Sequence, residues 1–214
     1  MSLKDEISHY IDEANYAAII KKGEESQAKV LRYVQMNLFG DYNLPQRWHA
    51  VEALGYLAKT FAENNDEVYR NVIRRALWAM NDESGNVPWC APEMMAAIIK
   101  ARPEQYGSFI PMLMTNAFDN PMCHRGLLWS IGYLGKAQYD NMEKFFEKLF
   151  ALIDSEESDI CGHAIWAFGS LEYPLLQEKL VDLVNDSRHL RLYEDSRIKD
   201  VTVGDLANRF IKRN

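Results

Sequence analysis

The segment Arg125-Gly-Leu-Leu-Trp-Ser-Ile-Gly132 decides the fold, because three further degenerate copies of it occur in the chain. The other copies run from Trp48 to Gly55, from Trp89 to Ala96 and from Gly162 to Gly169. Their last residues are 41, 36 and 37 positions apart, a spacing that is typical of one pair of helices per repeat. The period therefore predicts an all-α fold, an α-α superhelix in which each repeat packs on its neighbours.

The last position of each copy holds a small residue, either glycine or alanine. Glycine inside a helix costs about 1 kcal/mol relative to alanine, so its recurrence at one position needs a packing reason. We expect a neighbouring helix to approach closely at Gly55, Gly132 and Gly169.

The segments between the copies also have helical periodicity. One apolar stripe runs from Met142 to Ile153, and another runs from Leu176 to Val184. Pro111 lies inside the apolar stretch 109–117 and predicts a kink in that helix. Four other prolines lie where a first helical turn would begin, a position at which proline is tolerated: Pro45, Pro103, Pro121 and Pro174.

The two ends of the chain differ from the repeats, as the caps of a solenoid should. Residues 3–22 predict one amphipathic capping helix, and residues 24–185 contain the repeats. The stretch Arg188–Val203 alternates in polarity and breaks at 194–196, which predicts a small C-terminal β-hairpin before a last helix over 203–212. The whole chain, 1–214, is expected to form a single domain with caps at 1–23 and 186–214.

The stretch from Asp119 to Leu134 closely resembles the turn and second helix of a HEAT repeat. The resemblance implies that an Asp in the turn and an Arg early in the second helix form ladders between repeats. Asp119 with Arg125 and Asp41 with Arg47 match this pattern, and Pro111 matches the proline that kinks the family's first helix. The chain departs from the pattern in two copies, which have Gly162 in place of the arginine and Pro88 beside Trp89, so the ladder should be interrupted there. The Ala-x-x-Ala-Leu-Gly style of 50–55 is similar to the short HEAT repeats of the phycobilin lyases.

Charge and cysteine content limit the possible settings. The chain carries a net charge of −7, whereas a protein that binds nucleic acid through phosphates is expected to present a basic face. Three cysteines do not make a disulfide framework and favour a reducing, cytoplasmic location. Charged residues interrupt the first 20 positions, so neither a signal peptide nor membrane association is expected there.

The concave face of such a solenoid is lined by the second helix of each repeat, so equivalent positions form rows across it. Aromatic and acidic rows could bind a helix or an extended peptide, although the same tryptophans could instead be packing residues between helices. The candidate binding residues on these helices are Trp48, Glu52, Trp89, Glu93, Arg125, Trp129, His163 and Trp166. Asp82 and Glu83, in the polar segment 81–88, could line the edge of the groove or could simply cap the next helix.

Cysteine and histidine recur near the starts of these second helices, as Cys123-His124 and Cys161-Gly-His163, with Cys90 and His49 at equivalent places. Two such pairs could in principle form a tetrahedral zinc site. Neighbouring helices lie about 8–10 Å apart, and the chain lacks compact metal-ligand spacings. We therefore expect no metal and no cofactor.

Enzymatic relatives of the HEAT fold provide two tests. The deoxyhypusine hydroxylases hold iron with His-Glu pairs. The matching positions of this chain are Trp48-His49, Trp89-Cys90, Arg125-Gly126 and Gly162-His163. None of them is a His-Glu pair, which excludes an iron centre of that kind. The alkylpurine DNA glycosylases use groove tryptophans and a catalytic Asp, for which Asp82 and the tryptophans at 78, 89, 129 and 166 would be candidates. The leading hypothesis is a non-catalytic adaptor for a protein or peptide, and the alternative is a nucleic-acid-binding or DNA-repair protein.

Overall fold

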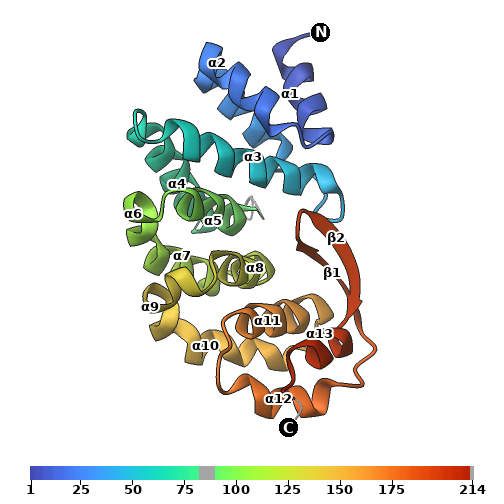
Figure 1. Ribbon diagram of the computed structural model, residues 1–214. Helices are drawn as coiled ribbons and strands as arrows, with labels where there is room; N and C mark the ends of the chain where they lie inside the picture. Colours follow the sequence, from blue (N-terminus) through green and yellow to red (C-terminus); the bar gives the residue numbers. More distant parts are fainter. Residues whose placement is uncertain (82–89, 213–214) are drawn as a thin grey trace.

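The computed structural model describes residues 1–81 and 90–212, and it confirms an all-α fold with one small β-hairpin (Figure 1). Four helices form an inner layer and pack on one another in chain order. They are the second helices that the repeat predicts: α3 (Pro45–Phe61), α5 (Ala91–Ala101), α8 (His124–Leu134) and α11 (Ser158–Ser170).

An outer layer of helices covers the other side of this stack, with α4 against α5, α7 against α8 and α12 against the last helix. Short 3-10 turns separate several of these helices. The outer layer consists of α2 (Tyr16–Asn37), α4 (Asp66–Met80), α6 (Pro103–Tyr106), α7 (Ile110–Asp119), α9 (Tyr139–Met142), α10 (Phe146–Phe150) and α12 (Leu176–Leu183).

The expected N-terminal helix over 3–22 is two helices, α1 (Leu3–Asp12) and α2. The chain turns at Ala14, whose φ of 52° lies in the left-handed region and cannot continue a helix. Asn15 then caps α2, because its side chain accepts a hydrogen bond from the Ala18 amide at 3.1 Å. The amphipathic pattern was thus interpreted correctly as helical, but the turn within it was not predicted.

Pro111 breaks its helix where only a kink was predicted. Helix α6 ends at Tyr106, a 3-10 turn spans Gly107–Phe109, and Pro111 lies in the first turn of α7. A proline ring clashes with the carbonyl four residues earlier, so a new first turn is the position that accommodates it. The predicted helix over 142–153 is likewise divided by 3-10 turns, at Glu143–Phe145 and Ala151–Asp154.

The C-terminal hairpin and the last helix are confirmed. Strand β1 (His189–Glu194) pairs antiparallel with β2 (Arg197–Thr202) through a two-residue turn at 195–196. Both turn residues have positive φ, 53° at Asp195 and 57° at Ser196, as the tight type I′ turn of a hairpin requires. Helix α13 (Val203–Phe210) follows directly and packs on α11, so it extends the inner layer by one helix.

The repeated small residues have the packing role that the sequence predicts. A Cβ at Gly55 would lie 3.4 Å from the Ala97 carbonyl of the next inner helix. A Cβ at Gly132 would lie 2.4 Å from the Trp166 ring, and one at Gly169 would lie 2.5 Å from the Phe210 ring. The close approach that the sequence predicts is therefore present at Gly132 and Gly169, whereas the contact at Gly55 is an ordinary one.

These two kinds of contact predict opposite effects of alanine. Gly132→Ala should lower the free energy of unfolding by about 1–3 kcal/mol, because the buried Trp166 ring leaves no space for a methyl group. Gly55→Ala should instead raise it by up to about 1 kcal/mol, since its contact is an ordinary one and alanine favours helix. Urea unfolding of both variants measures the difference. A stabilised Gly132→Ala protein would contradict the packing reason.

Candidate functional site

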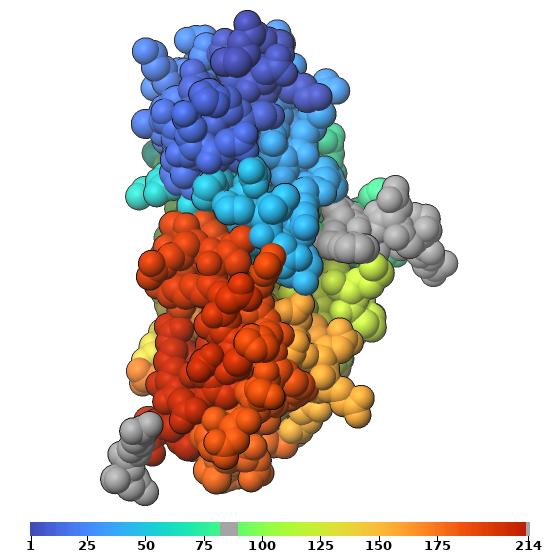
Figure 2. Space-filling model, turned by 90° about the vertical axis from the view of Figure 1, so that its right-hand side faces the viewer, coloured from blue at the N-terminus to red at the C-terminus, as the bar shows by residue number. Residues whose placement is uncertain are grey.

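The C-terminal hairpin covers the N-terminal halves of the inner helices, and Figure 2 shows hairpin and α13 together over this side of the molecule. The Tyr193 ring stacks on Trp48 with centroids 4.7 Å apart and an interplanar angle of 4°. The Tyr193 carbonyl accepts a hydrogen bond from Trp129 Nε1 at 2.9 Å, and the Glu194 carboxylate accepts one from Trp166 Nε1 at 2.8 Å. Only 2% of Trp48, 2% of Trp129 and 6% of Trp166 is exposed, so the tryptophans predicted to bind a partner contact the chain's own hairpin instead.

Polar contacts hold the hairpin against the first inner helix as well. The Ser196 hydroxyl donates to Glu52 Oε1 at 2.8 Å, and the Tyr16 hydroxyl donates to Glu52 Oε2. At the other side of the turn, Arg209 and Lys199 bind the Glu194 carboxylate and hold its pKa down at about 2. Glu52 is therefore at the edge of the covered surface, where it is half-buried and already accepts two hydrogen bonds.

Glu93, the second predicted acidic residue of the concave face, is fully buried and does not face a groove. Its Oε1 lies 3.0 Å from Arg47 Nη2 of α3 and 3.9 Å from Arg125 Nη2 of α8. Gly126 leaves the space that the Glu93 carboxylate occupies, because a Cβ at position 126 would lie 2.4 Å from Glu93 Oε2. One carboxylate on α5 therefore ties together the arginines of the preceding and following inner helices.

Arg47 and Arg125 are thus linked through Glu93, and not through the turn aspartates that the HEAT resemblance implies. Asp41 accepts a hydrogen bond from the Asn43 amide within its own turn at 2.8 Å. Asp119 is at the surface, 3.8 Å from the Lys148 ammonium. A residue in the first turn of α5 takes the place of the turn aspartates, because the inner helices are close enough for its side chain to reach both neighbours.

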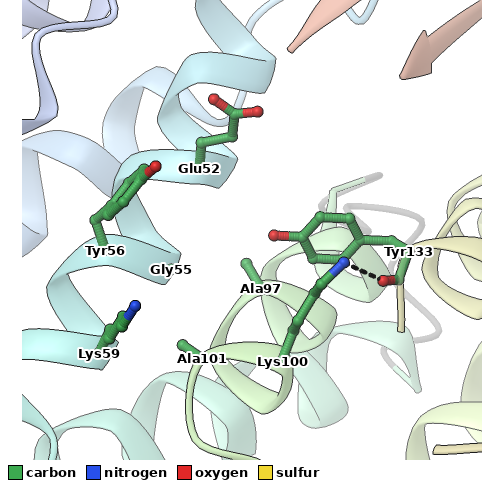
Figure 3. Close-up of a pocket in the computed structure, with 8 residues that line it drawn as sticks. All are labelled: Glu52, Gly55, Tyr56, Lys59, Ala97, Lys100, Ala101 and Tyr133. Atoms are coloured by element: carbon green, nitrogen blue, oxygen red, sulfur yellow. Dashed lines mark hydrogen bonds between the residues drawn. The ribbon is translucent and has the colours of Figure 1, made fainter. Parts of the chain in front are cut away.

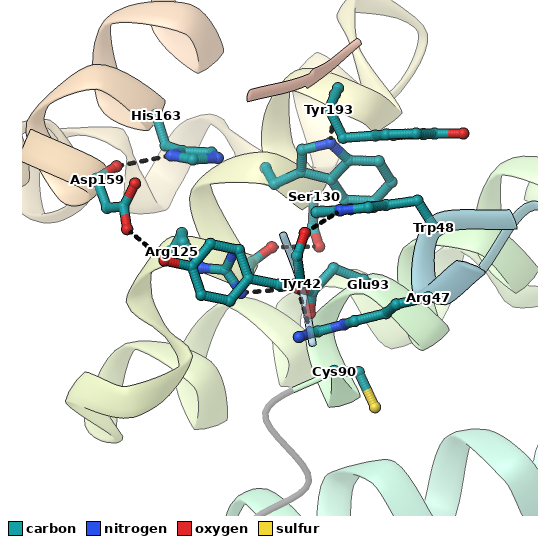
Figure 4. Close-up of polar contacts among 12 residues, drawn as sticks. Tyr42, Arg47, Trp48, Cys90, Glu93, Arg125, Ser130, Asp159, His163 and Tyr193 are labelled. Carbon is teal, nitrogen blue, oxygen red and sulfur yellow. Dashed lines mark hydrogen bonds and ion pairs between the residues drawn. The ribbon is translucent and has the colours of Figure 1, made fainter. Parts of the chain in front are cut away.

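The internal polar cluster around Glu93 also includes Arg125 and His163, two of the predicted binding residues (Figure 4). The Arg125 guanidinium lies 3.7 Å from the centroid of the Tyr42 ring, and the Tyr42 hydroxyl donates to Asp159 at 3.1 Å. The Nδ1 atom of His163 is 2.6 Å from the Asp159 carbonyl. Burial, and then the positive charge of Arg125, lower the pKa of His163 to about 3. Arg125 therefore contacts α5 and the turn before α3, His163 bonds within α11, and neither is presented to a partner.

The buried imidazole predicts a loss of stability towards acid. The unfolded chain protonates His163 near pH 6.5, whereas the folded protein does so only at about pH 3. Between these values the unfolded state binds more protons, so the stability present above pH 6.5 falls as the pH drops, by at most about 1.4 kcal/mol per unit. Urea unfolding at pH 7.0, 6.0 and 5.0 should show a flatter dependence for His163→Gln than for the wild type. Parallel curves would exclude this contribution.

The cysteine and histidine residues considered for zinc are engaged elsewhere. Cys90, Cys123 and Cys161 are unpaired and buried, and burial raises the pKa of Cys90 and of Cys123 to about 12. The His124 ring bonds the Phe118 carbonyl and the His49 ring bonds the Ile11 carbonyl, each at 2.8 Å. Across residues 1–81 and 90–212, no group of three or more His, Cys, Asp and Glu side chains could hold a metal ion.

The C-terminal halves of α3 and α5, with Tyr133 of α8, remain open and form a groove of about 310 Å³ (Figure 3). A second pocket of about 310 Å³ shares Glu52, Lys100 and Tyr133 with the first and continues it towards the tip of the hairpin. We call the two pockets together the inner groove. The first pocket is lined by Glu52, Gly55, Tyr56, Lys59, Ala97, Lys100, Ala101 and Tyr133.

Three of the predicted site residues line the inner groove. Glu52 lines both pockets, and Trp129 and Trp166 line the second one. Its exposed aromatic residue, Tyr56, and its half-buried one, Tyr133, were not predicted. The signal for them was present, because each directly follows the small residue of its repeat and lies four positions after a predicted site residue, Glu52 or Trp129. Residues four apart lie on the same face of a helix.

Asp82, Glu83 and Trp89 lie outside the described residues, as does Pro88. No helix in the described part of the chain is both long and apolar enough to cross a membrane. No family model, no curated protein and no solved structure matches this chain. The geometry of the inner groove is therefore the basis for a functional proposal.

Proposed function

We propose that this chain is a non-catalytic HEAT-type adaptor that binds a peptide or protein segment in the inner groove. The observation that carries the proposal is the division of the inner face into two parts. The hairpin covers its tryptophans, whereas Tyr56, with 45% of its surface exposed, stays open beside Tyr133, Lys59 and Lys100. Aromatic residues in a groove supply large contact areas at low entropic cost, which suits recognition of a partner.

The proposed binding surface is formed by residues one helical turn after the predicted tryptophans, and not by the tryptophans themselves. The three buried, unpaired cysteines suit a reducing compartment, so we place the adaptor in the cytoplasm. Of the tryptophans named for the nucleic-acid alternative, Trp129 and Trp166 are buried, and the exposed Trp78 of α4 does not line the inner groove, so this alternative is not favoured.

Photo-crosslinking tests this function at a defined position. A benzoylphenylalanine at position 56 should crosslink in the native host to a partner that also co-purifies with the wild-type protein, and Tyr133→Ala should abolish the crosslink. The matched control carries the same group at position 181, where valine is 61% exposed on the outer helix α12. Equal crosslinking at positions 56 and 181, or a partner that is retained fully by Tyr133→Ala, would reject the inner groove as the binding site.

A further inference from the structure

Three lysines occupy the same place in successive repeats, each four residues after the small residue that ends the copy. These positions form one row of the repeat, in which Lys59 and Lys100 lie in the last turns of α3 and α5, whereas Lys136 lies beyond the end of α8, in the 3-10 turn that follows. Two of them line the inner groove, and the third is paired at 2.6 Å with Glu172. The row is Lys59, Lys100 and Lys136.

The acids of the inner groove are already bound by the chain. Glu52 accepts from two hydroxyl groups, and Glu194 is paired with Lys199 and Arg209. Within residues 1–81 and 90–212, in contrast, neither Lys59 nor Lys100 has a carboxylate at ion-pair distance. Glu52 keeps its negative charge, since its two partners are neutral hydroxyl groups, but Lys59 and Lys100 outnumber it. The inner groove therefore presents an excess positive charge to a ligand, although the whole chain has a net charge of −7.

The Lys100 ammonium is held in place at the groove. Its Nζ atom donates to the Tyr133 carbonyl at 2.5 Å and lies 3.9 Å from the centroid of the Tyr133 ring (Figure 3). An ammonium group has three donors, so this arrangement fixes the cation while leaving donors for a ligand. The surrounding protein lowers the pKa of Lys100 by removing water from its charged form, and a ligand carboxylate would offset that loss.

The floor between the two lysines is made of small residues. Gly55, Ala97 and Ala101 line the first pocket, and they leave space for one apolar side chain of a ligand. A chain that fits both features has an apolar residue on the floor and carboxylates beside the lysines. A nucleic acid fits less well, because Lys59 and Lys100 are the cations that line the described inner groove, whereas nucleic-acid binding depends on many phosphate contacts.

We propose that the inner groove binds an acidic peptide, with Lys59 and Lys100 binding Asp or Glu side chains on either side of an apolar residue. The inference rests on the proposed function, because it names the partner class of the same site. Both lysines also lie in the last turns of their helices, where a cation stabilises the helix end. A role confined to the helix ends would alter stability and leave peptide binding unchanged.

A random 12-residue peptide library displayed on phage, selected on the full chain, tests the inference. We expect the selected peptides to be enriched in Asp and Glu around an apolar residue. The best of them, made synthetically, should bind the Lys59→Gln/Lys100→Gln protein at least about tenfold more weakly, since hydrogen bonds to charged groups are lost. Its affinity for the wild type should fall with added salt. The matched control is Lys29→Gln/Lys144→Gln, which removes the same charge from exposed positions outside the inner groove.

The outcomes separate the inference from the function on which it rests. Neutral or basic peptides that compete with the crosslink at position 56 would overturn the acidic class and leave the binding function standing. Equal affinity for the wild type and the groove variant would overturn the lysine role. Duplex DNA that displaces the selected peptides with higher affinity would overturn the peptide class. Selected peptides that never compete at position 56 would overturn the binding function itself.

Discussion

Replacing Glu93 by glutamine should lower the free energy of unfolding by about 3–5 kcal/mol, among the largest effects of any single conservative change in this chain. The fully buried carboxylate is shared by Arg47 and Arg125, whose side chains are only 3% and 13% exposed. An amide keeps the shape but removes the charge, so the two buried guanidinium groups would lose the anion that they share. Urea unfolding followed by circular dichroism measures the loss.

Two further variants make this prediction specific. Glu67→Gln removes an exposed carboxylate that pairs with Arg74, and it should leave stability close to the wild type, since exposed ion pairs contribute little. The triple variant Arg47→Met/Glu93→Leu/Arg125→Met replaces the whole buried group by apolar residues and should recover most of the lost stability. A Glu93→Gln protein as stable as the wild type would show that the carboxylate is not needed to balance the arginines.

Trp129→Ala should have a comparably large effect, about 3–5 kcal/mol, because it removes a buried indole from the contact between α8 and the hairpin. The change also removes the hydrogen-bond donor to the Tyr193 carbonyl. It removes as well the indole ring that packs against Trp48, since the centroids of the two rings lie 4.9 Å apart. We expect faster tryptic cleavage at Arg197 and Lys199 as the hairpin loosens, in addition to the lower unfolding midpoint in urea.

The controls for this variant separate ring packing from the hydrogen bond. Trp129→Phe keeps an aromatic ring but loses the N–H group, so it should cost only about 1 kcal/mol. Trp78→Ala removes a tryptophan of α4 that is 71% exposed, and it should leave both the midpoint and the cleavage rate near the wild type. Unchanged cleavage of the hairpin in Trp129→Ala would mean that β1 is held by other contacts.

The repeat could be predicted from sequence because it depends on local spacing. The small residue at the end of a copy marks the close approach of the next inner helix at Gly132 and Gly169, whereas the contact at Gly55 is an ordinary one. The turn residues Asp195 and Ser196 likewise marked the hairpin, since tight turns depend on a few local dihedral angles. The same local reasoning missed the turn at Ala14, where an alanine with positive φ leaves no signature in the amphipathic pattern.

The candidate site was harder to predict because it depends on contacts between distant segments. Sequence periodicity placed Trp48, Trp129 and Trp166 on the inner face, but it could not show that a hairpin 28 or more residues further along covers all three. Once the hairpin occupies that area, the accessible surface moves by one helical turn, to Tyr56 and Lys100. Glu93 was misplaced for a related reason, since its role depends on arginines of two other helices.

The contact of Ser196 with Glu52 has a consequence for how the chain folds. It joins residues 144 positions apart, whereas each unit of an open solenoid depends only on its neighbours. Loops of this length close at an entropic cost before their contacts form, so we expect folding to be slower and more cooperative than in an open array of equal size. During synthesis on the ribosome, the tryptophans of α3 and α8 would stay exposed to water until the C-terminal hairpin has been made.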